Sequence, residues 1–224
     1  MVSIIIPTLN EEAYIDKTLA NITAQNGEFE AIVVDGGSTD NTVKTIKMFT
    51  GVRLISSQKG RAIQMNSGAN IALGDVLLFL HADTTLPPNA IFAIEEKMAN
   101  SDIAGGCFFL KFDSNNLLLR IYSAFSKINH SLFTYGDHGF FVKKTIFEKI
   151  GGYADMPIME DVEILPKIKR SGRFIKLSQP VTTSARRFIK KGIVKQQLLN
   201  IALVVLYKIG VSPEKIKKYY SVSD

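Results

Sequence analysis

The sequence predicts an α/β fold in which helices cover both faces of a mostly parallel sheet. Short apolar runs rich in β-branched residues indicate the strands, at residues 2–6, 31–34, 52–55 and 76–80. Segments whose apolar residues have helical spacing separate these runs, at residues 11–25, 39–49 and 61–73. Strands that are apolar on both faces and alternate with helices are typical of parallel sheets buried between helices.

The pattern becomes less regular after Pro88. It predicts a helix to about residue 99 and then a strand, an amphipathic helix, an aromatic-rich patch and an apolar run, at residues 103–112, 117–128, 133–141 and 198–209. The apolar run is shorter than the roughly 20 residues that span a bilayer. We therefore expect it to form a helix that packs on the core or lies at a membrane surface.

The composition is that of an ordinary globular protein. Of its residues, 46% are hydrophobic and 21% are charged. The length of 224 residues is sufficient for one substantial hydrophobic core. The single cysteine, Cys107, excludes an internal disulfide and predicts a buried strand residue. The first residues lack the basic and long apolar regions of a signal peptide, so we expect a cytoplasmic location.

The net charge of +6 is unevenly distributed. Residues 164–213 contain eleven of the 27 Lys and Arg side chains and none of the 21 Asp and Glu side chains. Such a segment suits phosphate groups or an anionic membrane surface, and a solvated basic face is the alternative. We expect no nucleic-acid partner.

Polar residues follow each of the first four strands, where ligands of α/β sheets bind. In the segment 35–40, Asp35 ends a buried strand, Gly36 and Gly37 permit close backbone approach, and Ser38 or Thr39 can cap a helix. A carboxylate there can accept hydrogen bonds from a base or a ribose, although a plain capped turn explains the same residues. Neither GxGxxG nor GxxxxGK[ST] occurs.

His81 and Asp83 follow the most apolar strand. Alternation along an extended chain would place both side chains on one side, where they could bind a divalent ion that bridges to a diphosphate. Capping of a loop and of the next helix is the alternative. His138 is a further candidate, for the metal or for an acceptor pocket.

Two later segments carry chemistry that would complete such a site. Glu160 and Asp161 open a helix, where a carboxylate can act as a cap or as a general base for an acceptor hydroxyl. Arg186 and Arg187 follow the segment 181–184 and could clamp a diphosphate, or could be part of a solvated basic face.

Five segments, in this order, resemble the family 2 inverting glycosyltransferases of the GT-A fold. They are IPTLNEE at residues 6–12, DGGSTD at 35–40, KGR at 59–61 followed by NSGA at 66–69, HAD at 81–83 and ED at 160–161. Each motif alone is unspecific, but their order and spacing match over residues 1 to about 190. The HADT turn, together with TSARR at residues 183–187, is similar to a small bacterial subgroup of that family.

The resemblance assigns roles to the residues at these positions. It implies a nucleotide site formed by Pro7, Thr8, Asn10, Glu11, Asp35 and Arg61. It also implies that His81, Ala82 and Asp83 replace the DxD metal motif, with His81 in place of its first aspartate. Asp161, next to Glu160, would be the catalytic base. An imidazole in the metal site favours softer divalent ions than a carboxylate does.

The resemblance therefore implies an inverting hexosyltransferase that uses a nucleotide diphosphate sugar, with UDP as the expected nucleotide and Mn²⁺ or Mg²⁺ as the expected ion. A GT-A catalytic domain would occupy residues 1–190 and a basic helical appendage residues 191–224. The acceptor is open between a small molecule, a lipid phosphate and a glycan. Homodimerisation and attachment to the inner face of the membrane are also open. A non-catalytic binding module and a nucleotidyltransferase are the alternative functions.

Overall fold

The computed structural model describes residues 1–128 and 136–221, and residues 133–135 of the aromatic-rich patch lie outside this part. The strands are β1 Val2–Thr8, β2 Phe29–Asp35, β3 Val52–Ser56, β4 Val76–Phe79, β5 Thr84–Thr85, β6 Ile103–Phe112, β7 Phe140–Lys143 and β8 Arg173–Thr183. The helices that precede the ED motif are α1 Ile15–Thr23, α2 Thr42–Ile46, α3 Arg61–Ile71, α4 Ala90–Met98, α5 Leu117–Phe125, the short η2 Gly136–His138 and α6 Lys144–Lys149. The later helices are α7 Glu160–Arg170, α8 Arg186–Lys191, α9 Ile193–Lys208 and α10 Pro213–Ser221.

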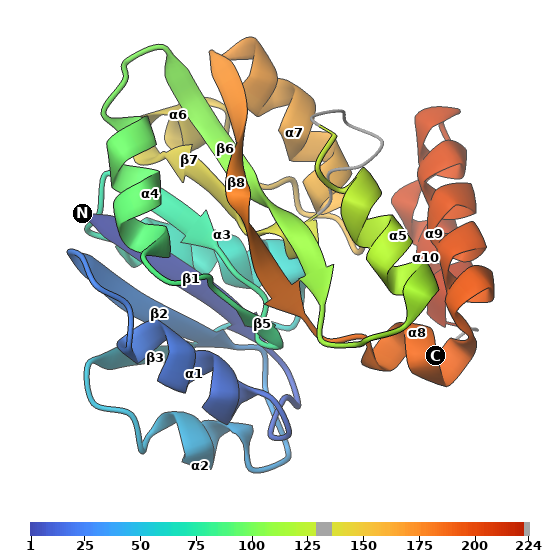
Figure 1. The fold of residues 1–224 in the computed structure, drawn as a ribbon, viewed down its shortest axis with the longest axis horizontal. Helices are drawn as coiled ribbons and strands as arrows, with labels where there is room; N and C mark the ends of the chain where they lie inside the picture. Colours follow the sequence, from blue (N-terminus) through green and yellow to red (C-terminus); the bar gives the residue numbers. More distant parts are fainter. Residues whose placement is uncertain (129–135, 222–224) are drawn as a thin grey trace.

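These strands form one sheet in the order β3-β2-β1-β4-β7-β6-β8-β5 (Figure 1). The first four strands of this order are parallel, and β6 is parallel to β8. The exceptions are β7, which is antiparallel to both of its neighbours, and the short edge strand β5. The predicted α/β fold with a mostly parallel sheet and C-terminal helices is confirmed.

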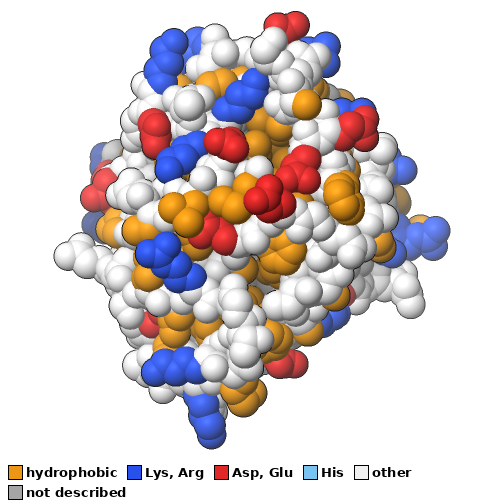
Figure 2. All heavy atoms as spheres, turned by 90° about the vertical axis from the view of Figure 1, so that its left-hand side faces the viewer, with side chains coloured by type: hydrophobic (Ala, Val, Ile, Leu, Met, Phe, Trp, Pro, Cys, Tyr) orange, Lys and Arg blue, Asp and Glu red, His pale blue; other side chains and the backbone are white. Residues whose placement is uncertain are grey.

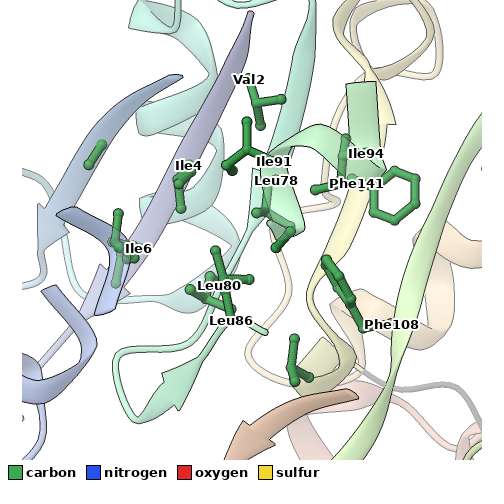
Figure 3. Close-up of a cluster of buried hydrophobic side chains, with 14 of the residues drawn as sticks. Val2, Ile4, Ile6, Leu78, Leu80, Leu86, Ile91, Ile94, Phe108 and Phe141 are labelled. Carbon is green, nitrogen blue, oxygen red and sulfur yellow. The ribbon is translucent and has the colours of Figure 1, made fainter. Parts of the chain in front are cut away.

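Side-chain alternation along the strands sends apolar residues into two cores. Val2, Ile4 and Ile6 of β1 point to the same face as Leu78, where α1 and α4 cover them (Figure 3). The alternate residues, such as Ile5, face α3 and α7 on the other side. Because each strand buries both faces, the strands read as continuous apolar runs in the sequence.

The C-terminal helices pack in a third, smaller cluster. Leu203 and Val204 of α9 and Ile216 of α10 are buried there together with Met159, which directly precedes α7. No helix in the described part of the chain is long and apolar enough to cross a membrane. The cluster therefore fastens the C-terminal helices beside the start of α7.

Two buried polar side chains fasten the backbone near the carboxyl ends of the strands. The Nε2 amide of Gln64 donates to the carbonyls of Thr8 and Val34, at 2.8 Å each, and so joins β1 to β2. His138 is 2% exposed, and its Nδ1 lies 3.1 Å from the carbonyl of Phe108. Since a carbonyl only accepts, Nδ1 carries the proton.

The burial of His138 predicts a pH-dependent stability. Burial, helped by the positive Lys176, lowers the pKa of His138 to about 3 in the folded protein, against 6.5 when it is exposed. Its contribution is fully present above pH 6.5 and is lost as the pH falls toward 3, because only the unfolded chain takes up the proton.

Between about pH 7 and about pH 5 this term should remove about 2 kcal/mol from the free energy of unfolding. Urea unfolding at both pH values measures the loss, and His138→Gln should reduce it by that amount. An equal loss in the variant and the parent protein would contradict the account.

Candidate active site

The candidate site lies at the sheet edge where β1, β2 and β4 end. Because β7 runs antiparallel to β4, its first residue and the preceding η2 lie at the same edge. The amino ends of α3 and α7 also meet here, since Arg61 and Glu160 form an ion pair between them. This is the edge at which α/β sheets bind ligands.

Asp35 ends β2 and organises the turn that follows it. Its side chain is buried and accepts hydrogen bonds from the backbone N–H groups of Gly37 and Ser38, at 3.0 Å each, and from the Ser38 hydroxyl. Gly37 has a φ of +94°, which favours glycine at this position. The carboxylate that the sequence assigns to the nucleotide base is thus held rigidly by its own turn.

The loop after β1 is bonded to the loop after β2. Asn10, with a left-handed φ of 55°, donates its N–H to the Ser38 hydroxyl at 2.9 Å and accepts from the Thr39 N–H at 2.9 Å. The Glu11 N–H donates to the Thr42 hydroxyl at 2.8 Å. Thr8 is buried beneath this loop and Pro7 is half-buried. The predicted nucleotide-lining residues therefore form one cross-linked wall.

Arg186 connects this wall to Asp83. Its Nη2 lies 2.6 Å from Oε1 of Glu11 and 3.1 Å from Oδ2 of Asp83, and its guanidinium stacks 4.3 Å from the ring centre of Tyr14. The pairing of β5 with β8 delivers Arg186 to this place, because Thr84 and Asp83 thereby lie beside the end of β8. The positively charged guanidinium of Arg186 therefore lies between two carboxylates that the sequence assigns to the donor site.

The HAD segment is a turn. The prediction that His81 and Asp83 alternate along an extended chain is wrong, because β4 ends at Phe79 and the Thr84 N–H donates to the His81 carbonyl at 3.1 Å. Inside the turn, the Ala82 carbonyl accepts from the Thr18 hydroxyl at 2.7 Å. These hydrogen bonds to the backbone of the turn fix the positions of the Cα atoms of His81 and Asp83.

His81 is electrically neutral in this surrounding. Its burial, and then the positive charges of Arg61, Arg187 and Arg186, lower its pKa to about 3. At neutral pH its imidazole therefore offers a nitrogen lone pair, the form that binds metal ions. Arg187 itself lies over the Tyr220 ring at 5.0 Å, so the structure brings its neighbour Arg186, and not Arg187, into contact with Asp83.

Glu160 and Asp161 have different surroundings. Glu160 is 2% exposed and its Oε1 lies 3.1 Å from Nη1 of Arg61. Burial raises the pKa of Glu160, and the charge of Arg61 opposes this shift. Asp161 instead accepts from the backbone N–H groups of Gly136, at 2.6 Å, and Val162, at 2.8 Å. Glu160 is thus placed to hold Arg61, and Asp161 is oriented by backbone donors.

The sequence-based predictions missed Asp137, which lies in η2 next to Gly136, the residue whose N–H bonds to Asp161. Its Oδ1 is buried without a hydrogen-bond donor in the described structure and lies 3.8 Å from Nε2 of His138. Burial, and then the negative charges of Asp161 and Asp83, raise the pKa of Asp137 to about 7. The sequence did contain one sign of this position, because Asp137 shortly precedes the apolar run that forms β7. Since β7 pairs with β4 in the antiparallel direction, the residues before β7 lie where β4 ends.

His138, a candidate metal ligand, points its Nδ1 at the Phe108 carbonyl. In the described ranges no three His, Cys, Asp or Glu side chains are grouped so that they could hold a metal ion. Mg²⁺ is commonly bound by one or two carboxylates together with substrate phosphates and water. Asp83 is a carboxylate of this kind, and the neutral His81 lies two residues before it. An ion bound here would also need oxygen ligands from a substrate diphosphate and water.

The sequence has relatives among known proteins. A PGL/p-HBAD biosynthesis glycosyltransferase of Mycobacterium bovis is 45% identical over 93 residues, which cover 38% of this chain and 36% of the relative. The probable glycosyltransferase YdaM of Bacillus subtilis is 26% identical over 202 residues, covering 78% and 48%. The chain thus spans between about a third and a half of the length of these curated relatives.

Solved structures share the fold. A mannosyltransferase from Pyrobaculum calidifontis in complex with GDP-Man and Mn²⁺ superposes with a TM-score of 0.67 at 21% identity, covering 95% of this chain and 66% of that one. S. aureus TarS 1-349 in complex with UDP-GlcNAc gives 0.64 at 18% identity, covering 82% and 58%. These likenesses support the GT-A fold. The model of the family described as "Glycosyl transferase family 2" matches residues 3–154, and this chain therefore belongs to that family.

Proposed function

We propose that this chain is an inverting glycosyltransferase that moves a hexose from a nucleotide diphosphate sugar, with UDP as the nucleotide, to a hydroxyl acceptor. The observation that supports this best is the Arg61–Glu160 ion pair of 3.1 Å, which draws the start of α7 to the nucleotide edge. Asp161 is the next residue along the chain. After the charge of Glu160, the negative charges of Asp161 and Asp83 also raise the pKa of Arg61. Family membership supports the same reading. Residues 1–190 would be the catalytic unit.

Asp161 is the general base of this proposal. The acceptor oxygen attacks the anomeric carbon as the bond from that carbon to the diphosphate breaks, and the hydroxyl proton passes to Asp161. Hydrogen bonds from the backbone N–H groups of Gly136 and Val162 orient its carboxylate. Attack from the side opposite the leaving group inverts the anomeric configuration.

The leaving diphosphate needs positive charge. Arg186 supplies it by exchanging its contacts with Asp83 and Glu11 for contacts with phosphate oxygens. Asp83 and His81 would hold a Mn²⁺ or Mg²⁺ ion, which neutralises charge on the departing nucleotide diphosphate when it is bound. We assign His138 a structural role, because its Nδ1 donates to the Phe108 carbonyl.

The role of Asp161 predicts a separation of catalysis from binding. Asp161→Asn keeps the shape of the side chain but removes the base, so turnover should fall by a factor of about 100 or more. The affinity for UDP should stay within about twofold. Release of UDP from UDP-sugars, with water or a hydroxyl acceptor, measures turnover, and calorimetry measures binding.

Asp155→Asn is the matched control, because Asp155 is an exposed aspartate shortly before the same helix. It should leave turnover unchanged. Retention of full turnover by the Asp161 variant would remove the base assignment.

The role of Asp83 predicts metal-dependent nucleotide binding. UDP should bind the parent chain about tenfold more tightly with Mn²⁺ than with EDTA, because the ion bridges protein and phosphate. Asp83→Asn should lose that difference. Asp102→Asn, an exposed aspartate before β6, should retain it. Equal UDP affinities of the parent chain with and without Mn²⁺ would argue against the assignment.

A further inference from the structure

Helices α5 and α9 each expose a stripe of large hydrophobic side chains. On α9 the stripe consists of Val194, Leu198, Ile201 and Val205, which are 46–61% exposed and three or four residues apart. On α5 it consists of Leu117, Leu118, Ile121 and Phe125, which are 38–67% exposed. Residues at this spacing share one face of a helix. The buried residues Leu203 and Val204 hold the other side of α9 in the third cluster.

The two stripes belong to one surface. An open groove of about 560 Å³ joins them, lined by Leu118 of α5, Phe188 and Ile189 of α8, and Val194 of α9. Figure 1 shows α5, α8 and α9 together on one side of the molecule. We call this surface, formed by residues 117–128 and 186–208, the basic apolar face.

The charge of this face is of one sign. Its two segments contain eight Lys and Arg residues and no Asp or Glu residue. Arg186 is paired with Glu11 and Asp83 in the active site, and the other seven are Arg120, Lys127, Arg187, Lys190, Lys191, Lys195 and Lys208. The side of the molecule that faces away from α9 carries both signs interspersed (Figure 2). A partner of this face must therefore offer apolar contact and negative charge together.

An anionic lipid surface meets both requirements. A second copy of the chain, docked through the same face, would bring like charges together without an acidic residue to pair them. A nucleic acid would pair with the cations but leave the hydrophobic stripes exposed to water. An interfacial helix with aliphatic residues and flanking lysines is the form that binds anionic bilayers, and nearby Lys and Arg residues strengthen that binding.

We propose that the basic apolar face docks on an anionic lipid bilayer, with α9 lying in the plane of the interface. The inference rests on the proposed function where it concerns the acceptor, because α8 begins with Arg186, which contacts Asp83 in the active site. A docked molecule would hold that site close to the lipid headgroups. The acceptor is then a hydroxyl carried on a lipid.

Vesicle co-sedimentation tests the docking without using activity. The full chain should sediment with vesicles of phosphatidylcholine mixed with phosphatidylglycerol, and high salt should weaken this binding. Phosphatidylcholine vesicles alone should bind at least about tenfold less. Absence of binding to both kinds of vesicle would overturn the proposal.

Two variants probe the two components of the face. Leu198→Ser with Ile201→Ser removes exposed apolar area, and Lys190→Glu with Lys195→Glu reverses charge. Each should lower vesicle binding about tenfold or more. Leu73→Ser is the matched control, because Leu73 is 73% exposed at the end of α3, and it should bind as the parent does. Parent-like binding by both double variants would overturn the proposal.

UDP binding separates this proposal from the proposed function. Both double variants should bind UDP as the parent does, which also checks that they fold. If the parent chain instead dimerises and the Leu198 and Ile201 variant does not, the face belongs to a second copy and the proposal fails. Failure of vesicle binding with UDP binding intact would leave the proposed function standing, and it would overturn the docking and the lipid acceptor.

Discussion

The clustering of negative charge at one sheet edge is the constraint on which the rest of the site depends. Two arginines form ion pairs there: Arg61 pairs with Glu160, and Arg186 pairs with Glu11 and Asp83. After the charge of Glu160, the negative charges of Asp161, Asp137 and Asp83 also raise the pKa of Arg61. Charges removed from water are costly unless they are paired, so the arginines are what permits this convergence. Acidic groups still outnumber the arginines, and burial raises the pKa of Asp137 to about 7. A divalent cation carried in with a diphosphate is suited to such a surplus.

The fold follows largely from local sequence patterns. The strands were predictable because each buries both faces, and the strand at residues 103–112 has the predicted bounds. The helices around the nucleotide loops were predicted too long. The α2 helix begins at Thr42 and not at residue 39, since the Thr39 N–H bonds to the side chain of Asn10. Long-range bonds to the β1 loop compete there with helix formation, and no helical pattern reveals them.

The site was predictable where the chemistry lies in a short motif, and not where topology creates it. The DGGSTD segment predicted a polar turn after β2, and the structure has this turn, although Asp35 and not Ser38 or Thr39 accepts from its backbone N–H groups. The partners of Gln64 and Asp137 exist only because β2 lies beside β1 and because β7 pairs with β4 in the antiparallel direction. The contact of Arg186 with Asp83 likewise depends on the pairing of β5 with β8. The amino-acid sequence alone does not directly indicate which strands pair with one another.

The C-terminal region combines two tasks that the sequence presented as alternatives. Its α9 helix packs Leu203 inward and exposes Leu198 outward, so that core packing does not exclude an external partner. Arg186 connects this region to the active site, since α8 starts at the residue that contacts Asp83 and Glu11. Arg186 therefore connects the residues of the proposed chemistry to the helices of the proposed docking surface.

A crystal structure of the chain with UDP and Mn²⁺ tests the central claim most directly. The account predicts an anomalous-scattering peak for manganese between Asp83 and the diphosphate. It also predicts that Arg186 has left Asp83 for a phosphate oxygen, while Arg61 keeps its ion pair with Glu160. Nucleotide bound away from this edge, or Arg186 still on Asp83 with no manganese there, would contradict it.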